Sequence, residues 1–236
     1  MTAIWRRELQ SYFYTATGYV YIGIFLLISS ILFQLQILTP RSSDLLTFLG
    51  QISYLWMLLS PVLTMRLMAG EKQRQTDRLL LSSPVSLTGI VLGKYLAAVT
   101  VMFLTVLLTG LYVLLVALYG RVYPGEILTG YLGFLLQGMA FAAIDLLMSS
   151  LAAGQVTAVL YAFGANFILW MLDMLSVSVP ASFGRVLDFF SLYARNEPFL
   201  MGQLSFASVI FDLSVTAAAL ALTVYGMDRA RRRGLR

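Results

Sequence analysis

Long apolar runs without charge, separated by short charged segments, dominate this chain of 236 residues. A helix needs about 20 consecutive apolar residues to cross the hydrocarbon core of a bilayer. Runs of that length predict spans within Gly18–Leu38, Leu45–Met65, Tyr95–Gly120 and Phe206–Met227. Lipid offers backbone amides no partner, so each span is expected to be an α-helix that bonds internally.

A further run, Ile127–Leu172, is too long for one helix and holds a single charge, Asp145. Small and polar residues cluster near its middle, over Ser149–Gln155, which is typical of a turn. The run therefore predicts two spans joined at that turn. The pattern as a whole predicts an all-α, polytopic membrane protein with six transmembrane helices, in a single domain over residues 1–236.

The first residues form a two-sided pattern that is too short and too charged for a span. On a helical wheel, one half holds Ile4, Trp5, Leu9, Tyr12, Phe13 and Ala16, and the other holds Arg6, Arg7, Gln10 and Tyr14. Tryptophan and arginine are typical of the membrane–water interface. Residues 1–17 therefore predict an amphipathic interfacial helix with Arg6 and Arg7 toward the headgroups. The alternative is a frayed tail with a chance periodicity.

The most charged segment between spans is Gly70–Pro84, with the sequence GEKQRQTDRLLLSSP. Opposite charges three residues apart, such as Glu71 and Arg74, favour a short helix. Pro84 is expected to end it. Three consecutive leucines follow the charges, and a plain loop has no need of them. We therefore expect this segment to dock against another protein, with a solvated loop as the alternative.

Residues 176–202 form a third segment outside the spans, in which aromatic residues and prolines alternate with scattered charges. The segment is too apolar for a free loop and too interrupted for a span. Irregular backbone at membrane depth is tolerated only where protein or a water-filled cavity covers it. We therefore expect a re-entrant or surface-lying pair of short helices on the extracytoplasmic side.

Composition narrows the chemistry further. Hydrophobic residues make up 59% of the chain and charged residues 11%, whereas soluble domains carry roughly 25% charged residues. The chain has no cysteine and no histidine. Their absence excludes disulfides, thiol nucleophiles, Cys/His metal sites and catalytic triads that depend on histidine. The net charge of +5 lies beside the apolar runs, so it indicates membrane orientation and not a nucleic-acid partner.

The distribution of Lys and Arg predicts the orientation. With the N-terminus in the cytoplasm, that side holds twelve of the sixteen: Arg6, Arg7, Arg66, Lys72, Arg74, Arg78, Lys94, Arg229, Arg231, Arg232, Arg233 and Arg236. The outer side holds four: Arg41, Arg121, Arg185 and Arg195. By the positive-inside rule, this excess predicts that both termini are cytoplasmic, and six spans place them on one side.

Two acids fall inside predicted spans, Asp145 and Asp212. A carboxylate at mid-membrane costs about 2.5–3.5 kcal/mol on insertion scales, so such groups usually face a partner or a cavity. They are candidates for substrate contact or proton binding in a transport pathway. The alternative is a structural hydrogen bond to a neighbouring helix. An aspartyl protease pair is disfavoured, because neither acid follows a glycine.

Glycines at small spacings in the fourth span, Gly130, Gly133 and Gly138, have a simpler interpretation. Small residues let transmembrane helices approach closely. We therefore expect these glycines to mark helix contacts and not a phosphate-binding loop.

The residues from Leu59 to Ser86, with Pro-Val-Leu-Thr-Met-Arg and Leu-Leu-Leu-Ser-Ser-Pro-Val, followed by Gly-Lys ending at Lys94, resemble the type 2 ABC exporter permeases. The closest branch is the gliding-motility-associated permeases. A second match lies in Ala140–Gln155, and the resemblance covers most of the chain. Two positions depart from the family: one acid is missing beside Glu71, and Asp145 stands where a small residue is usual.

The resemblance implies a permease subunit of an ABC exporter in the bacterial plasma (inner) membrane. Such a subunit is not itself an enzyme, because ATP and Mg bind to a separate ATPase subunit. The sequence agrees, since it contains no GxxxxGK[ST] phosphate loop. A second copy or a sister permease would complete the pathway. The rival function is a non-transporting membrane anchor or scaffold in a motility or secretion apparatus.

The resemblance also assigns roles within Gly70–Pro84. This segment would be the coupling helix seated on the ATPase subunit, with the helix of residues 1–17 beside it. Its charged contacts and its leucines in the groove would come from Glu71, Lys72, Arg74, Arg78, Leu79 and Leu80.

Overall fold

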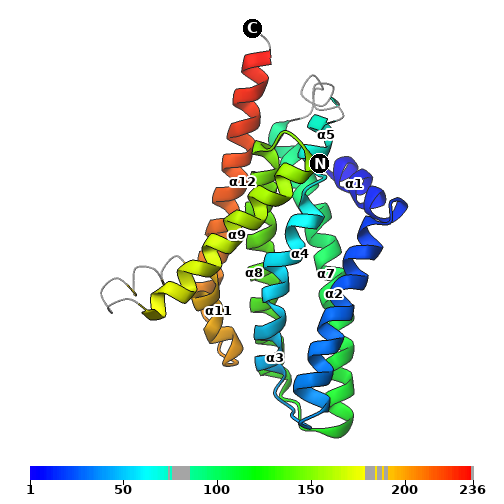
Figure 1. Ribbon diagram of the computed structural model, residues 1–236, viewed down its shortest axis with the longest axis vertical. Coiled ribbons are helices and arrows are strands. Elements are labelled where there is room, and N and C mark those ends of the chain that lie inside the picture. The colour runs from blue at the N-terminus through cyan, green and yellow to red at the C-terminus, as the bar shows by residue number, and fades with distance from the viewer. Residues whose placement is uncertain (74, 76–85, 179–183, 185–187, 189–190, 235–236) are drawn as a thin grey trace.

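The computed structural model describes residues 1–73, 75, 86–178, 184, 188 and 191–234. Within these ranges the chain is a bundle of helices joined by short turns, without a strand (Figure 1). The predicted all-α class is therefore confirmed. Both termini lie at the same end of the bundle, together with the helices α1 and α5 (Figure 1).

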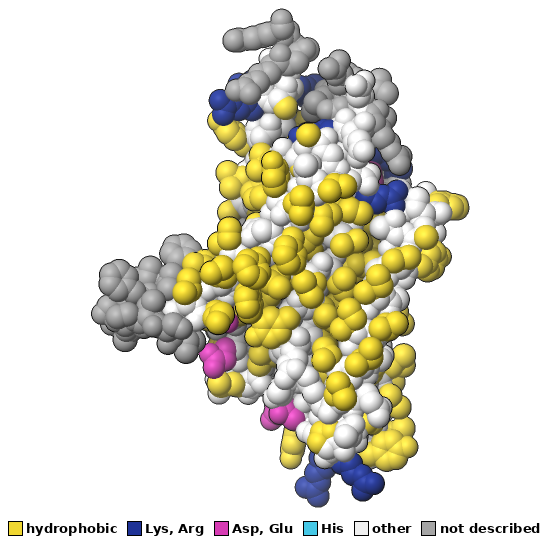
Figure 2. Space-filling model, viewed as in Figure 1, with side chains coloured by type: hydrophobic (Ala, Val, Ile, Leu, Met, Phe, Trp, Pro, Cys, Tyr) yellow, Lys and Arg dark blue, Asp and Glu magenta, His cyan; other side chains and the backbone are white. Residues whose placement is uncertain are grey.

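Five helical segments are long and apolar enough to cross a membrane. They are α2 (Thr17–Phe33) with the π-helical turn η1 (Gln34–Leu38), α7 (Leu87–Tyr119), α8 (Pro124–Leu151), α9 (Gln155–Ser178) and α12 (Phe206–Gly234). The hydrophobic side chains form a broad band across the face seen in Figure 2, with Lys and Arg gathered at its two ends. The structure thus confirms a polytopic membrane protein.

The remaining span, which is the second along the chain, is broken. It consists of α3 (Leu45–Ile52) and α4 (Tyr54–Thr64), which meet at Ser53 with a bend of 42°. The Ser53 hydroxyl donates to the carbonyl oxygen of Gly50 at 2.7 Å. This bond satisfies one of the carbonyls that a helix end leaves open. The predicted span over Leu45–Met65 is therefore present as a bent pair of helices, and the count becomes six only when this pair is taken as one span.

Helix α8 lies at the centre and packs against α4, α7, α9 and α12. Its fully buried Phe134 lies 4.8 Å from Trp56 between ring centroids, and Phe25 of α2 lies 5.1 Å from the same tryptophan. The Trp56 indole N–H also donates to the carbonyl oxygen of Phe134 at 3.0 Å. The tryptophan thus fills apolar space while its polar atom is satisfied, as burial of indole requires.

The glycines of α8 allow these close approaches, as predicted. A Cβ atom built on Gly133 would lie 2.5 Å from the Cβ of Phe199 and 2.6 Å from the Oδ1 of Asn196. On Gly138 it would lie 2.9 Å from the ring of Trp56. Real Cβ atoms do not approach other atoms so closely, so neighbouring helices could not pack here against larger residues.

Phe199 and Asn196 belong to α11 (Leu192–Leu200), the helix described within the predicted segment 176–202. The Asn196 amide donates to Gln137 of α8 at 2.9 Å, in a fully buried contact. Helix α9 extends as far as Ser178 at the start of the segment. Residues 179–183, 185–187 and 189–190 lie outside the described part, so the predicted pair of helices and its re-entrant placement stay predictions.

The N-terminal helix α1 (Thr2–Tyr14) is two-sided as predicted, which disfavours a frayed tail. Arg6 and Arg7 are exposed, while Tyr12 is buried and its hydroxyl donates to the carbonyl oxygen of Leu63 at 2.7 Å. Burial raises the pKa of Tyr12, so the phenol remains a neutral donor. The Trp5 indole donates to Thr100 of α7 at 3.0 Å. The apolar half of α1 therefore packs on protein, and its interfacial position stays a prediction.

Replacement of Gly133 tests the close contact of α8 and α11. Gly133→Ala should lower the midpoint of thermal unfolding in detergent, because overpacking a tight contact costs about 1–3 kcal/mol. Gly110→Ala in α7 is the matched control, since no atom lies within 4 Å of its Cβ position. Equal stability of the two variants would contradict the packing described.

Candidate functional site

The candidate coupling segment begins at α5 (Ala69–Gln73), a single turn of helix that follows α4. This turn does not continue through Gln75, whose φ of 57° lies in the left-handed region. The predicted single helix over Gly70–Pro84 is therefore wrong at this point. Four of the predicted ATPase contacts, Arg74, Arg78, Leu79 and Leu80, lie outside the described residues.

A buried lysine holds α5 in place. The side chain of Lys94, in the second turn of α7, has no exposed surface. Its Nζ lies 2.7 Å from Glu71 Oε1 and 3.4 Å from Glu8 Oε1, and donates to the carbonyl oxygen of Leu67. A buried ammonium is tolerated only with such partners. The contacts thus join α1, α5 and α7 around one charge.

Arg7 completes the network at the surface. Its guanidinium donates to Glu8 at 2.6 Å and to Glu71 at 3.2 Å. The hydrogen bond to Glu8, helped by attraction to both carboxylates, raises the pKa of Arg7 further above its ordinary value. Two cations therefore face two carboxylates, and the cluster is neutral as a whole. The side chain of Arg7 is 56% exposed, so its own contacts stabilise the fold only weakly.

The next residue of α5, Lys72, points to the turn between α8 and α9. Its Nζ donates to the carbonyl oxygen of Ser150 and lies 3.4 Å from that of Ala152. These carbonyls stand at the C-terminal end of α8, where a cation is favoured by the helix dipole. Both Glu71 and Lys72, predicted as contacts for an ATPase subunit, are therefore engaged within the chain.

Three further bonds join α5 and the end of α4 to the end of α8 and the start of α9. The Ser149 hydroxyl accepts from the amide of Ala69 and donates to the carbonyl oxygen of Met65, both at 3.2 Å. The amide of Gln155 donates to Gln73 Oε1 at 3.4 Å. The turn lies between Leu151 and Gln155, where the sequence predicted it. The two segments that carry the family resemblance therefore touch each other in the fold.

Two members of this site were missed by the sequence reasoning, Glu8 and the role of Lys94. A signal was present, because Lys94 stands just inside an apolar span and follows Gly93. A Cβ on Gly93 would lie 3.0 Å from Ile4 Cγ2, so the glycine lets α1 lie directly on α7. The pairing itself spans 86 positions in the sequence, and no local pattern could predict it.

Inside the membrane region, Asp145 is fully buried and fully bonded. Its Oδ2 accepts from the Ser60 hydroxyl, and its Oδ1 accepts from the Asn166 amide at 2.9 Å. Asn166 also donates to the carbonyl oxygen of Met57 at 3.4 Å. Pro61 leaves this carbonyl without its usual helical partner, because proline has no N–H. The cluster therefore links α4, α8 and α9, and a role of Asp145 in a pathway stays a prediction.

The second acid, Asp212 of α12, has different surroundings. It is 1% exposed, and neither carboxylate oxygen has a hydrogen-bond partner within the described ranges. The positive charge that acts on it is Arg195 of α11, whose guanidinium also lies 5.2 Å from the ring centre of Phe211. A buried carboxylate that lacks hydrogen bonds is costly. Of the two acids, Asp212 therefore has more unused bonding capacity for a ligand or partner.

No group of three or more metal-binding side chains occurs among the residues that the structure places. Comparison with protein families gives one assignment: the family described as ABC-2 family transporter protein matches residues 51–225. A comparison with curated proteins gave no match. The matched region runs from the end of α3 into α12, and so includes α5, Lys94 and both intramembrane acids. The chain therefore belongs to the ABC-2 transporter family, and it is a multi-pass, permease-type component of an ABC transporter.

Proposed function

We propose that this chain is the permease subunit of an ABC exporter in the bacterial plasma (inner) membrane, with both termini cytoplasmic. A separate ATPase subunit binds ATP and Mg and drives it. The run from Leu59 to Ser86 supports a place in the gliding-motility-associated branch. The observation that carries the proposal is the junction at α5, which bonds to α1, α7 and the turn between α8 and α9.

The junction suits the transmission of force. A displacement of α5 acts on α4 through the peptide chain. It acts on α7 and α1 through Glu71 and Lys94, and on α8 through Lys72 and Ser149. It acts on α9 through the bond between Gln73 and Gln155. Packed helices move as rigid bodies when their contacts hold. We therefore assign Glu71 and Lys72 to fastening the segment, and Arg74, Arg78, Leu79 and Leu80 to contact with the ATPase subunit.

One chain with six spans encloses little volume, so two permease subunits form the pathway in this proposal. The partner is a second copy or a sister permease, and lipid surrounds the pair. Asp145 and Asp212 are the candidate pathway residues, and Trp5, Arg6 and Arg7 keep α1 at the cytoplasmic interface. The rival, a membrane anchor that does not transport, requires no response of ATP hydrolysis to the permease.

Orientation is tested by labelling the chain, which has no cysteine of its own. Single cysteines at Ser43 and Tyr123 should react with a membrane-impermeant reagent in intact cells, because both positions are exposed at the end opposite the termini. A cysteine at Gln75 should react only after the cells are opened. Labelling of Gln75 from outside would overturn the orientation.

Contact with the ATPase subunit is tested with the leucines. Leu79→Ala with Leu80→Ala should abolish co-purification of the ATPase subunit, since each buried leucine contributes about 1.5–3 kcal/mol. Leu107→Ala with Leu114→Ala is the matched control, because both side chains are 64% exposed on the apolar surface of α7. If the ATPase subunit still co-purifies with the Leu79→Ala, Leu80→Ala variant, these leucines do not form the docking contact.

Coupling is tested separately with Glu71→Gln. This variant keeps the shape of the side chain but leaves Lys94 buried with one distant carboxylate, and removing one partner from a buried pair costs about 3–5 kcal/mol. The ATPase subunit should still co-purify, while the stimulation of ATP hydrolysis by the permease should fall strongly. Glu71→Asp should restore part of it.

The control is Glu126→Gln, an exposed acid in the first turn of α8 outside the network. Unchanged stimulation in Glu71→Gln would show that the network does not transmit force. Hydrolysis that never responds to the wild-type permease would favour the anchor.

A further inference from the structure

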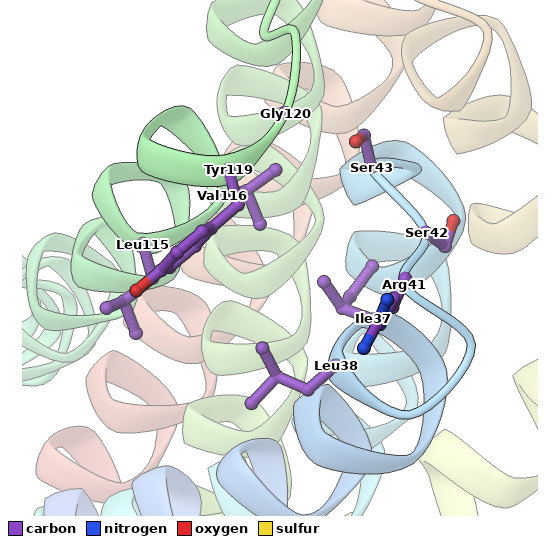
Figure 3. A pocket seen from close by; sticks show the side chains of 9 residues that line it. All are labelled: Ile37, Leu38, Arg41, Ser42, Ser43, Leu115, Val116, Tyr119 and Gly120. Atoms are coloured by element: carbon purple, nitrogen blue, oxygen red, sulfur yellow. The ribbon is translucent and has the colours of Figure 1, made fainter.

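At the end opposite the termini, a crevice of about 380 Å³ separates two elements (Figure 3). One wall is the end of η1 with the turn that follows it, and the other is the last turn of α7. In Figure 3, side chains from the two elements face each other across the gap. Arg41, Ser42 and Ser43 form the polar part of this lining. Leu38 of η1 and Leu115 and Val116 of α7 form its apolar part.

The crevice lies where the apolar surface of the bundle ends. Leu114 and Leu118 of α7 are 64% and 74% exposed, as expected of side chains that face lipid. The next residue, Tyr119, is 88% exposed, and Tyr123 follows with 61%. Tyrosines of this kind mark the boundary between hydrocarbon and headgroups. By this criterion the crevice lies at the boundary between hydrocarbon and headgroups.

Arg41 is suited to bind an anion there. No ion pair involves it among the described residues, and its φ of 56° lies in the left-handed region, which is unfavourable for a side chain of this size. The turn nevertheless holds this conformation, with the amide of Ser42 bonded to the carbonyl oxygen of Ile37 at 2.9 Å. A guanidinium offers paired donors that match two phosphate oxygens. The hydroxyls of Ser42 and Ser43 add two further donors.

One acid, Asp44, lies nearby, and its carboxylate already accepts hydrogen bonds within the chain. Asp44 caps α3, where its Oδ1 accepts from the amide of Thr47 at 3.1 Å and its Oδ2 accepts from the Thr47 hydroxyl at 2.6 Å. The helix N-terminus offsets its negative charge. The cation of Arg41 is therefore left for an outside partner.

We propose that this crevice binds an anionic phospholipid of the outer leaflet. The phosphate bonds to Arg41 and to the serine hydroxyls, and one acyl chain lies along Leu38, Leu115 and Val116. An amphiphile fits better than a free phosphate, because four of the nine lining residues are aliphatic and they adjoin the exposed apolar surface of α7. The inference rests on the proposed orientation, which places the crevice in the outer leaflet, and not on the proposed export function.

The test is native mass spectrometry of the full chain in detergent, titrated with phosphatidylglycerol or phosphatidylcholine. The wild type should retain one phosphatidylglycerol in preference to phosphatidylcholine. Arg41→Gln should weaken this binding about tenfold, as expected for loss of one charge-assisted pair. Arg121→Gln is the matched control, since Arg121 is exposed at the same end but does not line the crevice. It should bind as the wild type does.

A second variant tests the apolar part of the lining without a change of charge. Leu115→Trp fills the crevice, and the half-exposed position tolerates the larger ring. It should also lose the lipid, while an excess of inorganic phosphate should not displace the lipid from the wild type. Equal binding of the two lipids, equal loss in Arg41→Gln and Arg121→Gln, or displacement by phosphate would each overturn the proposal.

Discussion

At the end of the bundle where both termini lie, the packing of the helices depends on one buried charge, the ammonium of Lys94. A charge without exposed surface requires several polar partners, and no single helix can supply them. Glu71 comes from α5, Glu8 from α1 and a carbonyl oxygen from Leu67 before α5. The burial of one lysine therefore compels three separate segments to converge, and α5, the described start of the segment 70–84, is held against the bundle by the carboxylate of Glu71.

The same requirement shapes the interior of the bundle. Pro61 leaves one carbonyl oxygen of α4 without its helical N–H donor, and in lipid such a group must find another donor. Asn166 of α9 bonds to this carbonyl and also to Asp145 of α8, which in turn accepts from Ser60 of α4. A proline that would weaken an isolated helix thus becomes part of a link between three helices. Asp145, unusual at this position by resemblance, is integrated into that link.

The two regions lie in line along α4. Its N-terminal half joins the bundle through Trp56 and its C-terminal half through Ser60, and the turn of residues 65–68 leads from it to α5. Movement at α5 can therefore reach helices that do not touch it. The described parts of the segments 59–86 and 140–155 meet at this place.

The sequence by itself determined the features that depend on the size of each side chain and on its preference for water or lipid. These are the helical class, the approximate positions of the apolar spans, the two-sided N-terminal helix, the turn at Ser149–Gln155 and the close-packing role of Gly133, because each follows from local hydrophobicity or side-chain size. Only the tertiary structure decided the bend at Ser53, the inward pairing of Glu71 and Lys72, and the different surroundings of Asp145 and Asp212. A helical pattern shows which face is polar, but the residue that bonds to that face can lie as many as 109 positions away in the chain. Its identity depends on how the helices pack.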